Sequence, residues 1–224
     1  MTAKPKPFYK NTDSSLDPDA PFPGYSDHNI YPHHYEKKVI TRTGLEVFMR
    51  PIKPEDSSLL LDLFDALSPR TRYYRFFSPL NVLPQDMLIR FTKIDYNRDM
   101  ALVAIDLADT KEKILAVARF ISIPDLSEAE FAVMVRDEWQ GKGIGRVLLE
   151  NLIMIAKEKK IESMSGYVLA ENTHMLSLAG QLGFSLTRIP EENLYFLKVD
   201  LNPDCGTKKE LRQKPEATSG AKGA

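Results

Sequence analysis

The sequence has one cysteine, no long apolar run and almost no net charge. Because Cys205 has no partner for an internal disulfide, nothing argues for a secreted protein. The N-terminal residues lack the apolar stretch of a signal peptide, and charges interrupt each helical pattern before it reaches the length of a membrane span. A formal net charge of −1 gives no support for binding to nucleic acid or an acidic membrane surface. We therefore expect a cytoplasmic protein with neither as a partner.

The 224 residues are enough for one domain with a sizeable core and two flanking segments. Residues 1–35 are rich in Pro, Asp, Ser, His and Tyr without any period, which predicts an irregular N-terminal arm. Residues 202–224 have the composition of a disordered tail. Residues 36–201 alternate strand and helix patterns, and we expect them to form the folded domain.

Helix and strand patterns follow one another through this domain. The helical spacing of apolar residues predicts helices at 54–68, 84–94, 144–160 and 172–183. Alternating or continuous apolar runs predict strands at 45–52, 99–108, 113–123, 129–135, 163–170, 184–189 and 193–201. The second and third of these strands are expected to form a hairpin. This order predicts a mixed sheet covered by helices.

A glycine-rich turn, "QGKGIG" at 140–145, joins a predicted strand to a predicted helix. The first N–H groups of a helix have no partner within it, and the helix dipole places partial positive charge there, so phosphate binds well at such a turn. The Walker and Rossmann patterns both fail here, because Gly143 follows Lys142 and because the spacing is GxGxG. The pattern Gln/Arg-x-x-Gly-x-Gly/Ala fits Gln140, Gly143 and Gly145. A turn built only for close packing of strand and helix is the alternative.

The pattern that fits is the pyrophosphate loop of the GNAT acetyltransferases, and the chain resembles that superfamily. Asn172 at the start of the next helix, and Gly183-Phe184 at its end, also stand at the GNAT spacing. The resemblance covers about Tyr31 to Leu201 and implies the GNAT fold. That fold is an α/β (α+β) arrangement with a mixed, mostly antiparallel sheet of about seven strands flanked by four helices.

Four segments make the resemblance more specific: "RPIKPED", "LSPRTRYYRFF", "AEFAVMVRDEWQGKGIG" and "ENTHMLSLAGQLGF". They are similar to the GNAT domain of bacterial protein lysine acetyltransferases, which modify acyl-CoA synthetases. Those proteins are often fused to a synthetase-like region or carry a cyclic-nucleotide-binding domain. We do not expect the regulation carried by such regions to apply here.

Transfer of an acetyl group to a lysine needs a neutral amine, and only about 0.04% of a lysine with an ordinary pKa is neutral at pH 7. A general base is therefore required. In the strand "EAEFAVMV" two acids, Glu128 and Glu130, alternate with apolar residues and share one face. The resemblance places the base in this stretch and favours Glu130. Glu128 is more simply explained as a solvated strand end.

The resemblance implies acetyl-CoA as co-substrate and no metal ion. The pantetheine arm would pair with the strand backbone, and a backbone N–H there would polarise the thioester carbonyl. Lys142 and Arg146 either add positive charge beside the pyrophosphate or are ordinary surface residues. Asn172 either binds the cofactor or caps its helix, and it can do both. The cofactor-binding residues expected are Val133, Met134, Val135, Gln140, Gly141, Lys142, Gly143, Ile144, Gly145, Arg146 and Asn172.

One position departs from the GNAT pattern. Many members carry a Tyr about seven residues after the Asn, which donates a proton to the departing CoA thiolate; here that residue is Ala179. No other acid is obvious on this helix, since Ser177 is a poor one, so the proton donor stays unassigned.

Two further clusters of residues give weaker evidence for function. His33-His34 lacks the spaced partners of a metal site, and "YYRFF" at 73–77 is better explained by core packing than by an aromatic cage.

The favoured hypothesis is an acetyl-CoA-dependent N-acetyltransferase that acts on a protein lysine, such as one on an acyl-CoA synthetase. The stretch 68–96 is expected to form one wall of the acceptor site, and its excess of basic residues disfavours a cationic small amine. A small-molecule amine acetyltransferase is one alternative. An acyl-CoA-sensing module without catalysis is another, of a different class.

Overall fold

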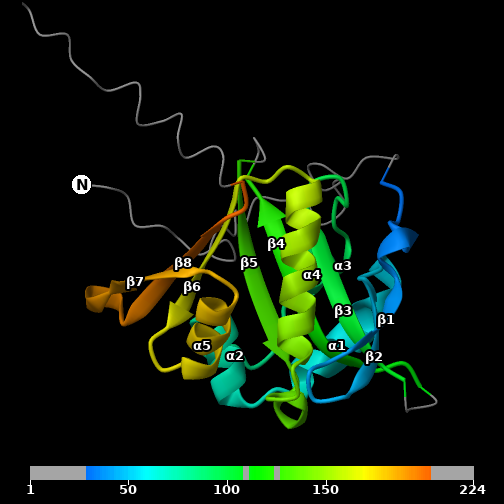
Figure 1. The fold of residues 1–224 in the computed structure, drawn as a ribbon. Helices are drawn as coiled ribbons and strands as arrows, with labels where there is room; N and C mark the ends of the chain where they lie inside the picture. Colours follow the sequence, from blue (N-terminus) through cyan, green and yellow to red (C-terminus); the bar gives the residue numbers. More distant parts are fainter. Residues whose placement is uncertain (1–28, 108–110, 124–126, 203–224) are drawn as a thin grey trace, which may run out of the picture.

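The computed structural model describes residues 29–107, 111–123 and 127–202 (Figure 1). The α-helices are α1 (Ser57–Asp65), α2 (Pro69–Phe76), α3 (Gln85–Thr92), α4 (Ile144–Glu158) and α5 (Thr173–Gln181). Four short 3-10 helices are η2 (His33–Tyr35), η3 (Pro54–Asp56), η4 (Asp137–Trp139) and η5 (Pro190–Glu192). The strands are β1 (Lys37–Ile40), β2 (Glu46–Pro51), β3 (Met100–Asp106), β4 (Ile114–Ser122), β5 (Glu128–Val135), β6 (Ser163–Leu169), β7 (Ser185–Ile189) and β8 (Leu194–Asp200). Residues 1–28 of the arm predicted at 1–35 and residues 203–224 of the tail predicted at 202–224 lie outside the described residues.

All the strands belong to one sheet, in the order β1-β2-β3-β4-β5-β6-β8-β7. Each neighbouring pair is antiparallel except β5 and β6, which are parallel. The predicted β3–β4 hairpin is confirmed, although part of its turn lies outside the described residues. The mixed, mostly antiparallel sheet predicted from the sequence is therefore confirmed.

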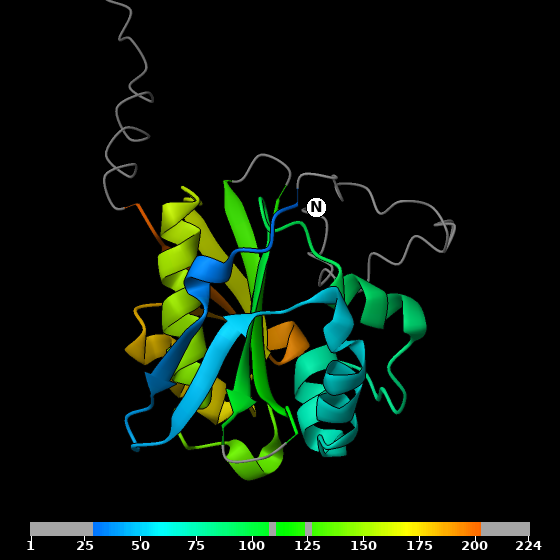
Figure 2. The same cartoon turned by 90° about the vertical axis from the view of Figure 1, so that its right-hand side faces the viewer.

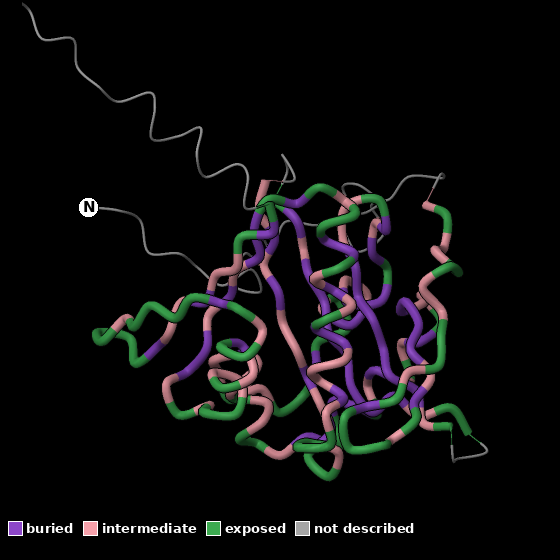
Figure 3. Tube along the Cα trace, viewed as in Figure 1, coloured by how far each residue is buried: buried purple, intermediate pink, exposed green. Residues whose placement is uncertain are grey.

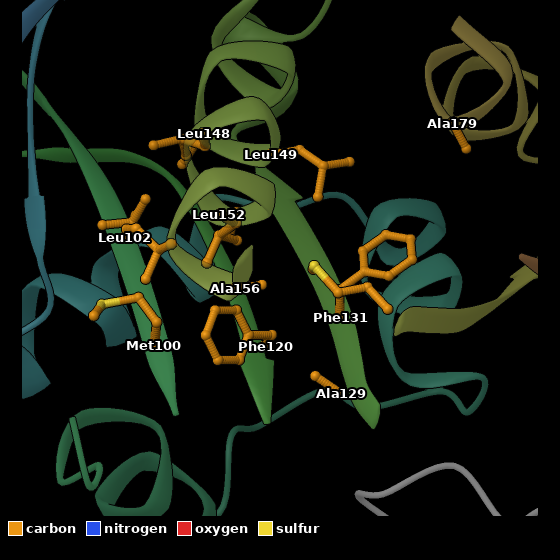
Figure 4. Packing of buried hydrophobic residues seen from close by; sticks show 14 of the residues in the cluster. Met100, Leu102, Phe120, Ala129, Phe131, Leu148, Leu149, Leu152, Ala156 and Ala179 are labelled. Atoms are coloured by element: carbon orange, nitrogen blue, oxygen red, sulfur yellow. The ribbon is translucent and has the colours of Figure 1, made fainter. Parts of the chain in front are cut away.

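Helices cover both faces of the sheet, and Figure 2 shows α4 on one side of the central strands and α1 to α3 on the other. Figure 4 shows Leu148 and Leu152 of α4 packed over Met100, Leu102 and Phe120, and all five side chains are fully buried. Buried residues of α1, α2 and α3 form a second core on the opposite face. Strands β3 and β4 are buried along almost their whole length, whereas β7 at the sheet edge is largely exposed (Figure 3).

The described residues contain eight strands and five α-helices, so the prediction of seven and four missed β1 and α2. Strand β1 is short and mostly exposed, so its sequence has no alternation of apolar and polar residues to detect. Helix α2 has mostly polar and charged residues and buries only Phe76. Its signal lies in the cap: Ser68 accepts a hydrogen bond from the Thr71 N–H, and Pro69 occupies the first turn.

Residues at the end of the predicted arm pack on the domain. The Asn29 side chain donates to the Ile94 carbonyl at 2.6 Å and accepts from the Tyr96 N–H at 2.8 Å. The Tyr31 hydroxyl donates to the Pro51 carbonyl at 3.0 Å. The segment from Asn29 onward thus lies against β2 and the chain that leads into β3.

Candidate active site

Strands β5 and β6 pair over a short distance and then diverge. Their parallel pairing joins 128–130 to 163–165, and no further pair between them occurs in the part of the chain that the structure describes. Figure 1 shows the two strands separating from this point, with α5 beside the gap. Gly166 lies where they part, and a Cβ there would come within 3.0 Å of the Phe131 ring and 3.2 Å of its carbonyl oxygen. The edge of β5 beyond Glu130 is therefore left without a strand partner on the β6 side.

A cavity of about 640 Å³ occupies this gap. Four parts of the chain enclose it: α2, the edge of β5, the glycine turn at the start of α4, and the start of α5 with the neighbouring part of β6. The expected site residues that line it are Glu130, Val133, Met134, Val135, Gln140, Gly141, Gly143, Ile144, Gly145, Arg146 and Asn172. The structure thus brings together eleven of the twelve residues expected from the sequence. Lys142 is the exception, because its ammonium group lies over the Trp139 ring, 4.2 Å from the centroid.

Two of the three glycines in the turn are required by the backbone. Gly141 and Gly143 have φ values of +75° and +83°, which side chains rarely tolerate. Gly145 lies in the first turn of α4, where a Cβ would meet Val135 and Val133 at the ordinary contact distances of 3.5 and 3.6 Å. No side chain of the described residues caps this end of α4. The first N–H groups of the helix are therefore available to an anionic ligand.

The turn between β1 and β2 contacts the glycine turn and helps to hold it in place. The Thr43 hydroxyl donates to the Lys142 carbonyl at 2.8 Å, and the hydroxyls of Thr41 and Thr43 are 2.9 Å apart. A Cβ on Gly143 would lie 3.2 Å from the Thr41 Cβ. Sequence reasoning missed both threonines, because they lie about a hundred residues before the turn that they contact.

Replacing Thr43 with Val keeps the shape of the side chain and removes the hydroxyl that holds Lys142. We expect the KM for acetyl-CoA to rise about 2- to 10-fold, the usual worth of one hydrogen bond, with little change in kcat. Steady-state kinetics would measure this change. Thr43→Ser keeps the hydroxyl and should behave like the parent; an equal rise in both variants would show that the hydrogen bond does not support the turn.

Glu130 lies at the point where β5 and β6 part. It pairs with Ser165 of β6 on one side and with Ile121 of β4 on the other. Its face of the sheet is the one that α1, α2 and α3 cover, since Met134 on the same face is buried among them. Glu128 lies two residues earlier at the strand end, partly exposed and paired with Lys198 at 2.9 Å. Tyr167 also lines the cavity, and burial together with the charge of Glu130 raises the pKa of its phenol.

The polar residues at the other end of the cavity have partners within the protein. The Gln140 amide donates to the Val135 carbonyl at 3.2 Å and to the Thr71 hydroxyl at 3.3 Å. The Arg146 guanidinium bonds to Gln181 of α5 and lies 3.3 Å from Glu150. The Asn172 side chain accepts from the Met175 N–H at 3.2 Å, so it caps α5.

Asp137 is a residue of this site that sequence reasoning missed. Its carboxylate accepts from the Ser68 N–H and hydroxyl, both at 2.8 Å, and from the Thr71 hydroxyl at 2.7 Å. Burial opposes ionisation of Asp137, but these hydrogen bonds outweigh it and lower its pKa. The carboxylate therefore fixes the start of α2 beside the glycine turn and sets the position of one cavity wall.

The helix α5 contributes no tyrosine to this cavity. Ala179 is fully buried, belongs to the same hydrophobic core as the inward side chains of α4, and does not line the cavity. Figure 4 shows it on α5, apart from Leu148 and Leu152. Ser177 does line it, and its hydroxyl accepts from the Gln181 amide at 3.1 Å. Position 179 is therefore a packing position in this chain.

The two weaker sequence clusters have separate places in the fold. Of the residues 73–77, Phe76 is a core residue, Tyr73 is 41% exposed, and Tyr74 lines the cavity, so core packing explains only part of this cluster. His33 and His34 form part of η2, and the described residues hold no group of three or more His, Cys, Asp or Glu arranged to bind a metal ion. None of the helices in the described ranges is long and apolar enough to cross a bilayer.

A sheet that opens beside a glycine turn, with that turn leading into an uncapped helix, is the architecture of an acyl-CoA-dependent N-acetyltransferase. The chain belongs to the acetyltransferase (GNAT) family, whose profile matches residues 62–184. Acetyl-CoA is accordingly its co-substrate.

Three relatives agree with this assignment. Acetyltransferase PA5475 of Pseudomonas aeruginosa is 30% identical over 150 residues, which cover 67% of this chain and 81% of that protein. Acetyltransferase Pat of Mycolicibacterium smegmatis is 29% identical over 167 residues, which cover 74% of this chain and 49% of Pat, so the match spans about half of that relative. The crystal structure of the GNAT domain of S. lividans PAT superposes with a TM-score of 0.69 at 29% identity, covering 76% of this chain and 99% of the domain.

Proposed function

We propose that the protein transfers the acetyl group of acetyl-CoA directly to a lysine of a protein acceptor, with Glu130 as the general base. The observation that carries this proposal is the layout of one cavity. The uncapped start of α4 lies at one end, and Glu130 lies where β5 and β6 part. An acyl-CoA with its pyrophosphate on the glycine turn and its pantetheine arm along β5 would point its thioester toward Glu130.

Each part of the cofactor has a matching feature on this path. The pyrophosphate would accept hydrogen bonds from the N–H groups of the turn from Gly141 to Arg146. The pantetheine amides would pair with the open backbone edge of Val133 to Val135, as an added strand does. A backbone N–H on this edge would then polarise the thioester carbonyl as negative charge develops on its oxygen. The acceptor amine, deprotonated by Glu130, would attack that carbonyl carbon, and the C–S bond would then break to release CoA as its thiolate.

The acceptor side of the cavity has a basic wall. Arg70 and Arg75 of α2 line the cavity, whereas Arg72 points back toward α1 and donates to the carbonyls of Asp65 and Asn81. Two of the basic residues in the stretch 68–96 thus face the cavity, fewer than the sequence alone implied. Their charge disfavours polyamines and aminoglycosides and favours a lysine with acidic neighbours on a protein surface. The resemblance of the sequence to bacterial protein lysine acetyltransferases supports the same class of acceptor.

An acetylation assay on purified acyl-CoA synthetase, run beside a panel of small amines, tests this proposal. We expect incorporation into one or a few lysines of the synthetase and little turnover of spermidine or an aminoglycoside. The rate should fall as salt rises, because exposed charges steer the acceptor toward Arg70 and Arg75. Rapid turnover of a small amine with no mark on any protein would favour the small-amine alternative.

A further inference from the structure

Arg119 of β4 is a buried cation without the partner that such residues usually have. Three arginines are buried among the described residues: Arg50, Arg119 and Arg136. Arg50 pairs with Asp56 and Arg136 with Asp62, but Arg119 makes no ion pair with a carboxylate of the described chain. Buried charges are normally paired because removing a charge from water is costly. The Arg119 charge therefore needs an explanation beyond packing.

The contacts of Arg119 hold its guanidinium in place without neutralising it. One nitrogen donates to the Phe91 carbonyl at 2.9 Å, and the guanidinium lies over the Phe91 ring, 4.3 Å from its centroid. The side chain is 5% exposed. Burial and the nearby charge of Arg75 lower the pKa of Arg119 to about 9, against the opposing effect of the Asp99 carboxylate, and Arg119 stays charged at neutral pH.

The sheet register directs this cation toward Glu130. In the antiparallel β4–β5 pair Arg119 stands opposite Ala132, and Ile121 stands opposite Glu130. Arg119 and Glu130 are therefore diagonal neighbours on one face, a spacing that long side chains can bridge. Both residues, with Arg75, also line a second small cavity of about 30 Å³, which has room for one water molecule.

Other charged groups also lie near Glu130 and Arg119. Arg75 approaches from α2, and its guanidinium lies near the rings of Phe76 and Phe91. Lys198 of β8 pairs with Glu128. Asp99 accepts from the Ser122 N–H at 3.0 Å, and burial raises its pKa. Tyr167 approaches from β6 and is neutral at physiological pH.

We propose that Arg119 is a positioning residue whose buried charge keeps the Glu130 carboxylate ionised and directed into the active-site cavity. This inference rests on the proposed function of Glu130 as the base. An ionised carboxylate can accept the amine proton, whereas a protonated one cannot. A fixed cation near Glu130 would keep its carboxylate ionised at neutral pH, although the site is partly buried.

Three variants separate the charge of Arg119 from its packing. Arg119→Gln removes the charge but can still donate to the Phe91 carbonyl, Arg119→Lys keeps the charge, and Arg119→Met serves if the glutamine variant does not fold. Loss of the charge should raise the pKa of Glu130, because an adjacent cation favours the ionised form. The pH at which kcat/KM begins to fall on the acid side should then rise by about one unit or more. At pH values below this midpoint the Arg119→Gln protein would be about tenfold less active than the parent, and at high pH the two would be equal. Arg119→Lys should restore the parent profile.

A titration of the Glu130 carboxyl by carbon-13 NMR, assigned with Glu130→Gln, tests the pairing without using activity. We expect the midpoint to move to higher pH in Arg119→Gln and to stay in place in Arg119→Lys. An unchanged midpoint in a folded Arg119→Gln protein would overturn the inference. A midpoint that moves while the kcat/KM profile stays fixed would keep Arg119 as the counter-ion of Glu130 and remove Glu130 as the base. The two proposals can therefore fail separately.

Discussion

Replacing Glu130 with Gln is expected to slow acetyl transfer by about 10²- to 10⁴-fold, the usual contribution of a positioned general base. The affinity for acetyl-CoA should stay close to that of the parent, because the amide has nearly the shape of the carboxylate and lies at the end of the cavity opposite the glycine turn. Single-turnover rates and calorimetry would measure the two quantities. The expected pattern is a loss in rate with little loss in binding.

The pH dependence of this loss separates base catalysis from a structural effect. The neutral fraction of a lysine amine rises about tenfold with each pH unit below its pKa, so the variant should recover part of its rate as the pH increases. Equal rates in parent and variant across pH 6–9 would remove Glu130 from the mechanism. A parent that binds acetyl-CoA but transfers nothing to any acceptor would favour the sensing module.

The chain offers a matched control for this experiment. Glu128 has the same side chain, lies two residues earlier on the same face of β5, and is held by Lys198 rather than facing the cavity. Glu128→Gln removes the same charge at almost the same place in the sheet. We expect it to keep the parent's rate within a factor of a few, and a loss as large as that of Glu130→Gln would indicate that the local charge of the strand matters rather than one base.

The local features of this site could be predicted from the sequence. Gly141 and Gly143 reveal the turn because the positive φ at each position restricts the residue type. The cap at Asn172 and the alternation along β5 are also local, since each depends on residues within one turn or one strand. Predictions based on such short spacings agreed with the structure.

The residues that the sequence did not reveal act across long separations. Thr43 contacts the glycine turn across 99 residues, and Asp137 holds the start of α2 across 69. Arg119 becomes a neighbour of Glu130 only through the register of β4 on β5. Neither a threonine in a turn nor an arginine in an apolar strand carries a signal for these roles, because the partner depends on the tertiary fold.

Replacing Gly143 with Val is expected to weaken acetyl-CoA binding by about 10- to 100-fold. This is the usual loss when a charged group, here the pyrophosphate, loses one strong hydrogen bond. Two features of the structure lead to this expectation. The residue has a φ of +83°, and a Cβ would lie 3.2 Å from the Thr41 Cβ, so a branched side chain must displace either the turn or the threonine below it. Displacement of the turn would move its N–H groups away from the pyrophosphate. Calorimetric titration with acetyl-CoA would measure the change.

A second glycine separates this effect from backbone strain alone. Gly183 at the end of α5 has a φ of +86°, and a Cβ there would meet nothing within 4 Å. Gly183→Val therefore carries a similar cost of about 1–2 kcal/mol for a left-handed residue, at a position that does not line the cavity. It should lower the melting temperature through the same backbone strain and leave the affinity for acetyl-CoA unchanged. Unchanged affinity in a folded Gly143→Val protein, or an equal loss in both variants, would show that the glycine turn is not the pyrophosphate site and only joins β5 closely to α4.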